Sequence, residues 1–186
     1  MGTELEAVRD TLPEAAKDIR LNLQSVLQGG PLTPAQRWGT AVAAALAARN
    51  PRLRDALVAE ARREVEEAVI EDARAAAAIM AMNNIYYRFT HLASAPDYRT
   101  LPAKLRMNVI GKPGVAKPDF ELWSLAVSAI NGCGMCIDAH ERELVKKGAA
   151  KELVQNAVRI AAVVQAVAVT FEGAAALTEV PAAAAA

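Results

Sequence analysis

The 186-residue sequence has few aromatic residues, two cysteines and no net charge. Phe, Trp and Tyr together make up 4% of the chain, whereas direct counting gives 42 alanines. Alanine has the best intrinsic helix propensity and is depleted in strands, so this composition excludes an all-β fold. The 21 Lys and Arg residues balance 21 Asp and Glu residues and form no basic stripe, which excludes a typical nucleic-acid binder.

Long hydrophobic runs are also missing. The longest apolar stretch, residues 160–171, is interrupted by Gln165 and is shorter than the roughly 20 residues that a membrane span needs. Residues 1–6 are acidic and lack the basic flank and apolar run of a signal peptide. The sequence therefore predicts a cytoplasmic protein without a membrane partner.

The length and the 53% hydrophobic content suit one ordinary domain with its own core. We expect a single all-helical domain over residues 1–180. The alanine-rich tail at 181–186 is low in complexity and is expected to fray.

Proline, glycine and capping residues divide the chain into helices. Thr33 is a candidate N-cap followed by Pro34 and by Gln36, which completes a capping box, and the pair Asn50 and Pro51 repeats the cap-then-proline pattern. No segment alternates between apolar and polar residues, so no sheet is expected. The predicted helices cover residues 13–28, 34–48, 51–92 with a short break near 62–67, 103–110, 118–131, 134–147 and 150–176.

A weak internal repeat relates the two halves of the chain. An offset of 85 residues aligns Trp38 with Trp123, and it also aligns three small residues of each segment, Ala41, Val42 and Ala44 with Ala126, Val127 and Ala129. Small residues are common here, so the matches arise either from chance or from duplication of a helical unit. We expect a compact multi-helix fold in both cases.

Both cysteines fall in one CxxC motif, Cys133 to Cys136, and His140 follows four residues later. At 100° per residue the three side chains share one narrow helical face. Gly132 and Gly134 flank the first cysteine, which indicates that the motif begins a helix, where unpaired N–H groups and the helix dipole favour a thiolate and lower a thiol pKa.

Three interpretations of this motif are open: a structural pair of thiols, a zinc site completed by Glu121, and redox chemistry. A disulfide across so short a loop stabilises little, and a closed zinc site needs four ligands. Redox chemistry is therefore favoured and no metal is expected. Glu121 is either a first-turn charge that suits the helix dipole or, if its helix packs antiparallel to the next one, a partner of His140 in a proton relay to a cysteine. Tyr86 and Tyr87 either border a pocket or pack in the core, and their apolar helix favours packing.

The pattern Glu121, Cys133, Cys136 and His140 resembles the active-site motif of the AhpD (alkylhydroperoxidase D) family, within the carboxymuconolactone decarboxylase-like superfamily. Further similarity covers nearly the whole chain, at residues 15–23, 36–40, 78–84, 107–110 and 120–124. The resemblance implies an AhpD-like helical subunit, assembled as a homotrimer. It also implies a lipoyl-dependent antioxidant peroxidase that reduces hydroperoxides and an AhpC-type peroxiredoxin. No tightly bound cofactor is implied, and the electrons come from dihydrolipoamide on a lipoylated 2-oxoacid dehydrogenase component.

The resemblance also implies a role for each site residue. Cys136 corresponds to the cysteine that forms the sulfenic acid, and Cys133 to the resolving cysteine and proton donor that joins it in a redox disulfide. His140 corresponds to the proton relay and Glu121 to the base. Met135 is a departure, because some family members carry a histidine there; the methionine either serves packing or replaces an auxiliary proton carrier.

Two rival functions remain at this stage. A carboxymuconolactone decarboxylase-like enzyme would share the helical fold but would not need a redox dithiol. A noncatalytic redox sensor or adapter would switch a partner through its disulfide and would not turn over peroxide.

Overall fold

The computed structural model describes residues 3–178, and within that range the chain forms helices and turns but no strand. The all-α prediction is confirmed. The tail predicted at 181–186 lies outside the described residues, and a single domain over 1–180 stays a prediction. The α-helices are α1 (Thr3–Asp10), α2 (Lys17–Gln28), α3 (Pro34–Ala48), α4 (Pro51–Glu64), α5 (Glu67–Leu92), α6 (Asn108–Gly111), α7 (Lys117–Ile130), α8 (Gly134–Lys146) and α9 (Lys151–Thr178), with 3-10 helices at Glu14–Ala16 and Pro96–Arg99.

The capping residues begin α3 and α4 as predicted. Thr33 Oγ1 accepts a hydrogen bond from Gln36 N at 3.2 Å, and Gln36 Oε1 accepts one from Thr33 N at 3.2 Å. Asn50 Oδ1 accepts a hydrogen bond from Leu53 N at 2.9 Å. These bonds satisfy backbone N–H groups that the first turn of a helix leaves free.

The predicted break near 62–67 is also present, because Val65 and Glu66 adopt extended conformations between α4 and α5. Arg62 spans the break and donates to both carboxylate oxygens of Glu67 at 3.2 Å. The hydrogen bond with this guanidinium lowers the pKa of Glu67.

Two predictions of local structure were wrong or incomplete. The first helix was not predicted, although α1 places Leu5 fully inside the core. The helix predicted at 103–110 is reduced to the single turn of α6 at residues 108–111. Lys104 has a left-handed φ of 52°, which a helix does not accommodate, and so the chain reaches α6 as an irregular segment.

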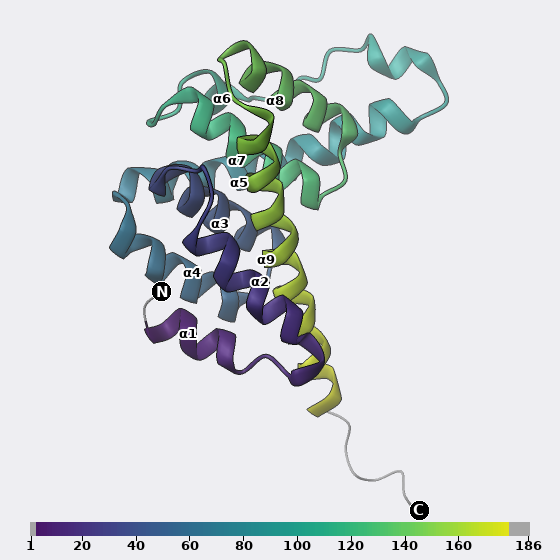
Figure 1. Ribbon diagram of the computed structural model, residues 1–186. Coiled ribbons are helices and arrows are strands. Elements are labelled where there is room, and N and C mark those ends of the chain that lie inside the picture. Colours follow the sequence, from purple (N-terminus) through teal and green to yellow (C-terminus); the bar gives the residue numbers. More distant parts are fainter. Residues whose placement is uncertain (1–2, 179–186) are drawn as a thin grey trace, which may run out of the picture.

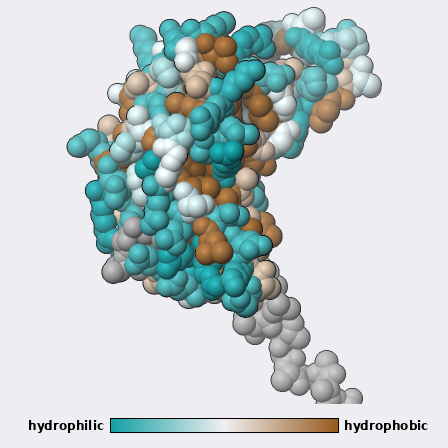
Figure 2. All heavy atoms as spheres, in the orientation of Figure 1, coloured by the Kyte–Doolittle hydropathy of each residue, from teal (hydrophilic) through white to brown (hydrophobic). Residues whose placement is uncertain are grey.

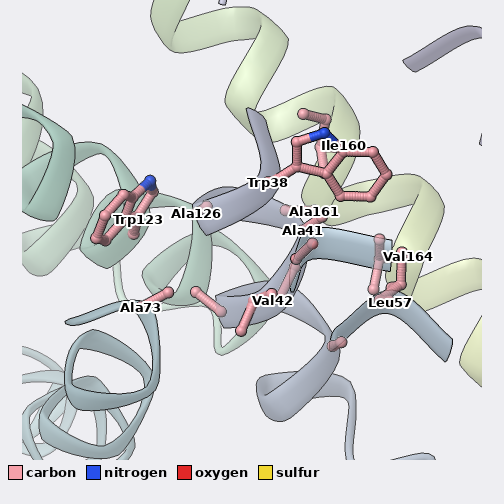
Figure 3. Packing of buried hydrophobic residues seen from close by; sticks show 14 of the residues in the cluster. Trp38, Ala41, Val42, Leu57, Ala73, Trp123, Ala126, Ile160, Ala161 and Val164 are labelled. Carbon is pink, nitrogen blue, oxygen red and sulfur yellow. The ribbon is translucent and has the colours of Figure 1, made fainter. Parts of the chain in front are cut away.

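The core forms around α3, which packs against α4, α5, α7 and α9 (Figure 1). Consecutive alanines of α3, at positions 43 to 45, are at most 1% exposed, and Figure 3 shows α3 side chains between those of the neighbouring helices. Alanine allows helix axes to approach closely. Gly39 is closer still, since a Cβ there would lie 2.2 Å from Cε2 of the buried Trp123 on α7.

Two sets of three successive helices, separated by α6, have similar lengths. Helices α3, α4 and α5 contain 15, 14 and 26 residues, and α7, α8 and α9 contain 14, 13 and 28. The first helices of the two sets pack against each other. This order and pairing are what a duplicated helical unit would produce, and the duplication stays a prediction.

The long helix α9 runs beside α2, α3 and α7 (Figure 1). Its residues Lys151–Ala174 are long and apolar enough to cross a membrane by length and composition alone, with a mean hydropathy of 1.5. This segment is longer than the apolar run at residues 160–171, which is too short to span a membrane. Ile160, Val164 and Val167 are buried against neighbouring helices, and 39% of the apolar window is buried in all, so core packing accounts for part of its apolar character.

An arm formed by the end of α5 and residues 93–107 projects from the body (Figure 1). It carries four exposed large apolar side chains, and Figure 2 shows apolar residues on it among hydrophilic ones. These side chains are Phe89, Leu92, Tyr98 and Leu101. The arm begins a short distance along α5 from the site described next.

Candidate active site

The two cysteines lie at the start of α8 and are joined in a disulfide, with Cα atoms 5.3 Å apart. Cys133 is the N-cap and Cys136 lies in the first turn. Gly132, with a φ of 66°, makes the turn that leads from α7 into the motif, a conformation that favours glycine. The N–H groups of this first turn favour negative charge on a sulfur once the disulfide is reduced.

Glu121 and His140 meet across the contact between α7 and α8. His140 Nδ1 lies 2.6 Å from Glu121 Oε2, and both side chains are buried. Of the two interpretations of Glu121, the structure supports the one in which Glu121 contacts the imidazole of His140, because α7 and α8 pack against each other. A carboxylate on one ring nitrogen fixes the orientation of the ring.

The other ring nitrogen faces a methionine. His140 Nε2 lies 3.2 Å from Met80 Sδ, which is contributed by α5. The two ring nitrogens of His140 therefore face two acceptor atoms, a carboxylate oxygen on one side and a thioether sulfur on the other. Met80 lies within residues 78–84, which resemble the family, but its contact with His140 was not predicted because the two residues are 60 positions apart.

A cavity of about 280 Å³ opens beside Cys136. Its walls come from α5, α8 and the region around α6, and most of its side chains are apolar. The lining residues are Met80, Asn83, Tyr87, Met107, Ile110, Met135, Cys136, Ala139 and His140.

The two sulfurs are placed unequally with respect to this cavity. Cys136 contributes to the wall, whereas Cys133 is fully buried and is not part of the lining. Tyr87 lines the cavity too, although its apolar helix had favoured core packing, and Met135 adds a thioether to the wall.

A buried polar network holds the turn before Cys133. Asn84 Nδ2 donates to Ser128 Oγ at 2.9 Å, and Asn84 Oδ1 accepts from Asn131 Nδ2 at 2.9 Å. Arg88 donates to the carbonyl of Asn131 at 2.6 Å, and Cys133 N donates to the carbonyl of Ser128 at 3.1 Å. The network fixes α5 to the end of α7 and so positions the motif.

The four residues proposed for a zinc site are otherwise engaged. The sulfurs of Cys133 and Cys136 are bonded to each other, and Glu121 is hydrogen-bonded to His140. Within residues 3–178 no group of three or more His, Cys, Asp or Glu side chains is arranged to hold a metal ion.

Comparison with known proteins first defines the class. The sequence model of the carboxymuconolactone decarboxylase family matches residues 96–179, which include α7, α8 and the CxxC motif. This match extends over the second set of helices.

Full-length relatives define the family more closely. The chain is 61% identical over 168 residues to an alkyl hydroperoxide reductase AhpD of Anaeromyxobacter dehalogenans, covering 90% of each chain. It is 58% identical to the protein of the same name from Brucella anthropi, covering 91% of this chain and 97% of the relative. A third AhpD, from Rhodospirillum centenum, is 58% identical over 94% of both chains. The chain therefore belongs to the AhpD family.

Proposed function

We propose that this protein is a dithiol peroxidase that reduces alkyl hydroperoxides through Cys136 and Cys133. The observation that carries the proposal is the paired cysteines at the start of α8, with Cys136 on the wall of an apolar cavity that also contains His140. The names of the relatives, alkyl hydroperoxide reductase AhpD, support the same activity.

The reaction begins with the reduced dithiol. Glu121, acting through His140 and a water molecule in the cavity, takes the proton from Cys136. The thiolate attacks the terminal oxygen of the hydroperoxide, the O–O bond breaks, and the other oxygen takes a proton and leaves as the alcohol. Cys136 becomes a sulfenic acid, and Cys133 attacks it to form the disulfide with release of water.

Three observations support these roles. Cys136 lines the cavity, Cys133 lies within bonding distance behind it, and Glu121 contacts the imidazole at 2.6 Å. His140 and Cys136 share the cavity wall, and the proposed water would lie in the cavity between them. The buried carboxylate holds the ring in place for repeated proton transfer.

Dihydrolipoamide is proposed as the electron donor that returns the disulfide to the dithiol. Its thiolate attacks one sulfur of the disulfide, and the other sulfur leaves as a thiol. The second lipoyl thiol then attacks the lipoyl sulfur of the mixed disulfide, which closes the lipoyl ring and releases the attacked cysteine as a thiol. Cys136 is the sulfur that the reductant reaches, since Cys133 is fully buried. An AhpC-type peroxiredoxin and a lipoylated 2-oxoacid dehydrogenase component are the proposed partners, on the strength of the family resemblance.

A homotrimer in the cytoplasm is the proposed physiological form. The exposed apolar side chains of the arm support self-association, because isolated subunits rarely expose a contiguous apolar surface without a partner. The reducing cytoplasm suits a dithiol that must be regenerated after each cycle.

A coupled assay with dihydrolipoamide as donor and an alkyl hydroperoxide as acceptor tests activity and electron source together, with thioredoxin as the comparison donor. We expect continuous turnover with dihydrolipoamide and none in a Cys136→Ser variant. Normal turnover by that variant would contradict the assignment of Cys136. A protein that is oxidised once and then stops would instead be a redox sensor.

A further inference from the structure

The side-chain amide of Asn83 is buried on the wall of the cavity without a hydrogen-bond partner. Asn83 belongs to α5, is 4% exposed, and lines the cavity together with Cys136 and His140. Its Oδ1 is buried and unpaired, and neither polar atom of the amide forms a hydrogen bond to any of the described residues. An unpaired buried amide costs stability, so a site that retains one has a use for it.

The adjacent asparagine shows that this is not a general property of the helix. Asn84 uses both ends of its amide, donating to Ser128 and accepting from Asn131, each at 2.9 Å. The two residues are neighbours in sequence but point about 100° apart around α5. One amide is satisfied inside the protein, and the other faces the cavity.

The chemistry of the cavity narrows the class of ligand. Apart from Asn83, His140 and Cys136, the lining is made of methionine, isoleucine, alanine and the tyrosine ring. Such a wall accommodates an apolar body that carries one polar group. An amide offers a donor and an acceptor side by side, and a hydroperoxide offers the complementary set, an O–H donor and two acceptor oxygens.

We propose that Asn83 is the residue that binds the peroxide group of an organic hydroperoxide in this cavity. Its N–H donates to a peroxide oxygen and its carbonyl accepts from the peroxide O–H, while the alkyl group contacts the methionines. This inference rests on the proposed function. The bonds made and broken are those of that reaction: sulfur gains an oxygen and loses two electrons, and the peroxide is reduced to the alcohol. Asn83 stabilises the charge that develops on the departing oxygen.

Measuring oxidation by peroxide and reduction of the disulfide separately distinguishes a peroxide-binding role of Asn83 from a structural one. In Asn83→Leu, we expect the rate constant for oxidation of the reduced protein by tert-butyl hydroperoxide to fall about tenfold or more, because the hydrogen bonds to the peroxide are lost. Reduction of the disulfide by dithiothreitol and alkylation of the reduced protein by iodoacetamide should stay within about twofold, since neither uses these hydrogen bonds. The melting temperature should not fall, because an unpaired polar group has been removed.

Asn22→Leu is the matched control, since it makes the same change at an exposed position of α2. It should leave both half-reactions unchanged. If Asn83→Leu does not fold, Asn83→Ala takes its place with the same expectations.

Two results would overturn the inference. One is an Asn83 variant that is oxidised within twofold of the wild-type rate; the other is a variant in which oxidation, disulfide reduction and alkylation all slow equally. Failure of peroxide to oxidise the wild-type protein would be a different result, because it would refute the proposed function itself and the inference with it.

Discussion

The close approach of Gly39 to Trp123 predicts whether alanine at position 39 raises or lowers the stability of the protein. A Cβ at Gly39 of α3 would lie 2.2 Å from Cε2, 2.4 Å from Cζ2 and 2.6 Å from Nε1 of Trp123 on α7. Carbon atoms in contact are about 3.5 to 4.0 Å apart, so α3 and α7 would have to separate by roughly 1.5 Å. The indole cannot turn away freely, because it is fully buried and donates to the carbonyl of Gln36 at 3.3 Å.

Two effects oppose each other in Gly39→Ala. Alanine in place of glycine stabilises a helix interior by about 1 kcal/mol. Overpacking costs about 1 to 3 kcal/mol, and an indole left without its acceptor costs about 1 kcal/mol more. Overpacking wins, and we expect a net loss of about 2 kcal/mol, which lowers the melting temperature by about 4 to 8 °C in a chain of this size.

Gly173→Ala is the matched control for this measurement. Gly173 also lies inside a helix, α9, but a Cβ there meets nothing within 4 Å. The same substitution should therefore raise stability by about 0.5 to 1 kcal/mol. Thermal unfolding followed by circular dichroism, at one protein concentration, measures both. A Gly39→Ala protein as stable as the wild type would refute the reasoning about the contact between α3 and α7.

Three further predictions concern the site and a helix cap. Cys133→Ser should stop after one turnover and leave a sulfenic acid on Cys136 that dimedone traps; continued turnover with dihydrolipoamide would contradict a resolving role for Cys133. Glu121→Gln keeps the shape of the carboxylate but loses its charge on His140, so kcat should fall about 100-fold or more while the circular dichroism spectrum is unchanged. Asn50→Ala removes the cap of α4 and should cost about 1 kcal/mol in urea unfolding without changing kcat; an unaltered midpoint would argue against the cap.

Local signals predicted the parts of the structure that depend on local chemistry. The starts of α3 and α4 follow from Thr33 and Asn50, because a side-chain acceptor satisfies N–H groups only two or three residues away. The start of α8 follows from a different local signal, the glycines beside Cys133, of which Gly132 makes the turn with a φ of 66°. The pairing of Glu121 with His140 needed one further assumption, that their two helices pack antiparallel.

The remaining parts depend on contacts between distant segments. Met80, Asn83 and Tyr87 reach the site because α5 packs against α7 and α8. Residues 78–84 resemble the family and Tyr87 was a candidate for the border of a pocket, but the sequence did not show which side chains of the helix face the cavity. The prediction of a helix before α6 was wrong because Lys104 adopts a left-handed conformation, which is uncommon for lysine and cannot be predicted from its local sequence. The sequence therefore predicted that the two cysteines pair and that Glu121 contacts His140, but not the walls of the cavity around them.

The unequal placement of the two sulfurs has a kinetic consequence. Cys136 lies on the cavity wall and Cys133 is fully buried. Oxidant and reductant must therefore both reach the sulfur of Cys136 through the cavity. Neither can enter while the other occupies the cavity. The enzyme should alternate between an oxidised and a reduced form, with parallel lines in double-reciprocal plots and inhibition by either substrate when it is present in large excess.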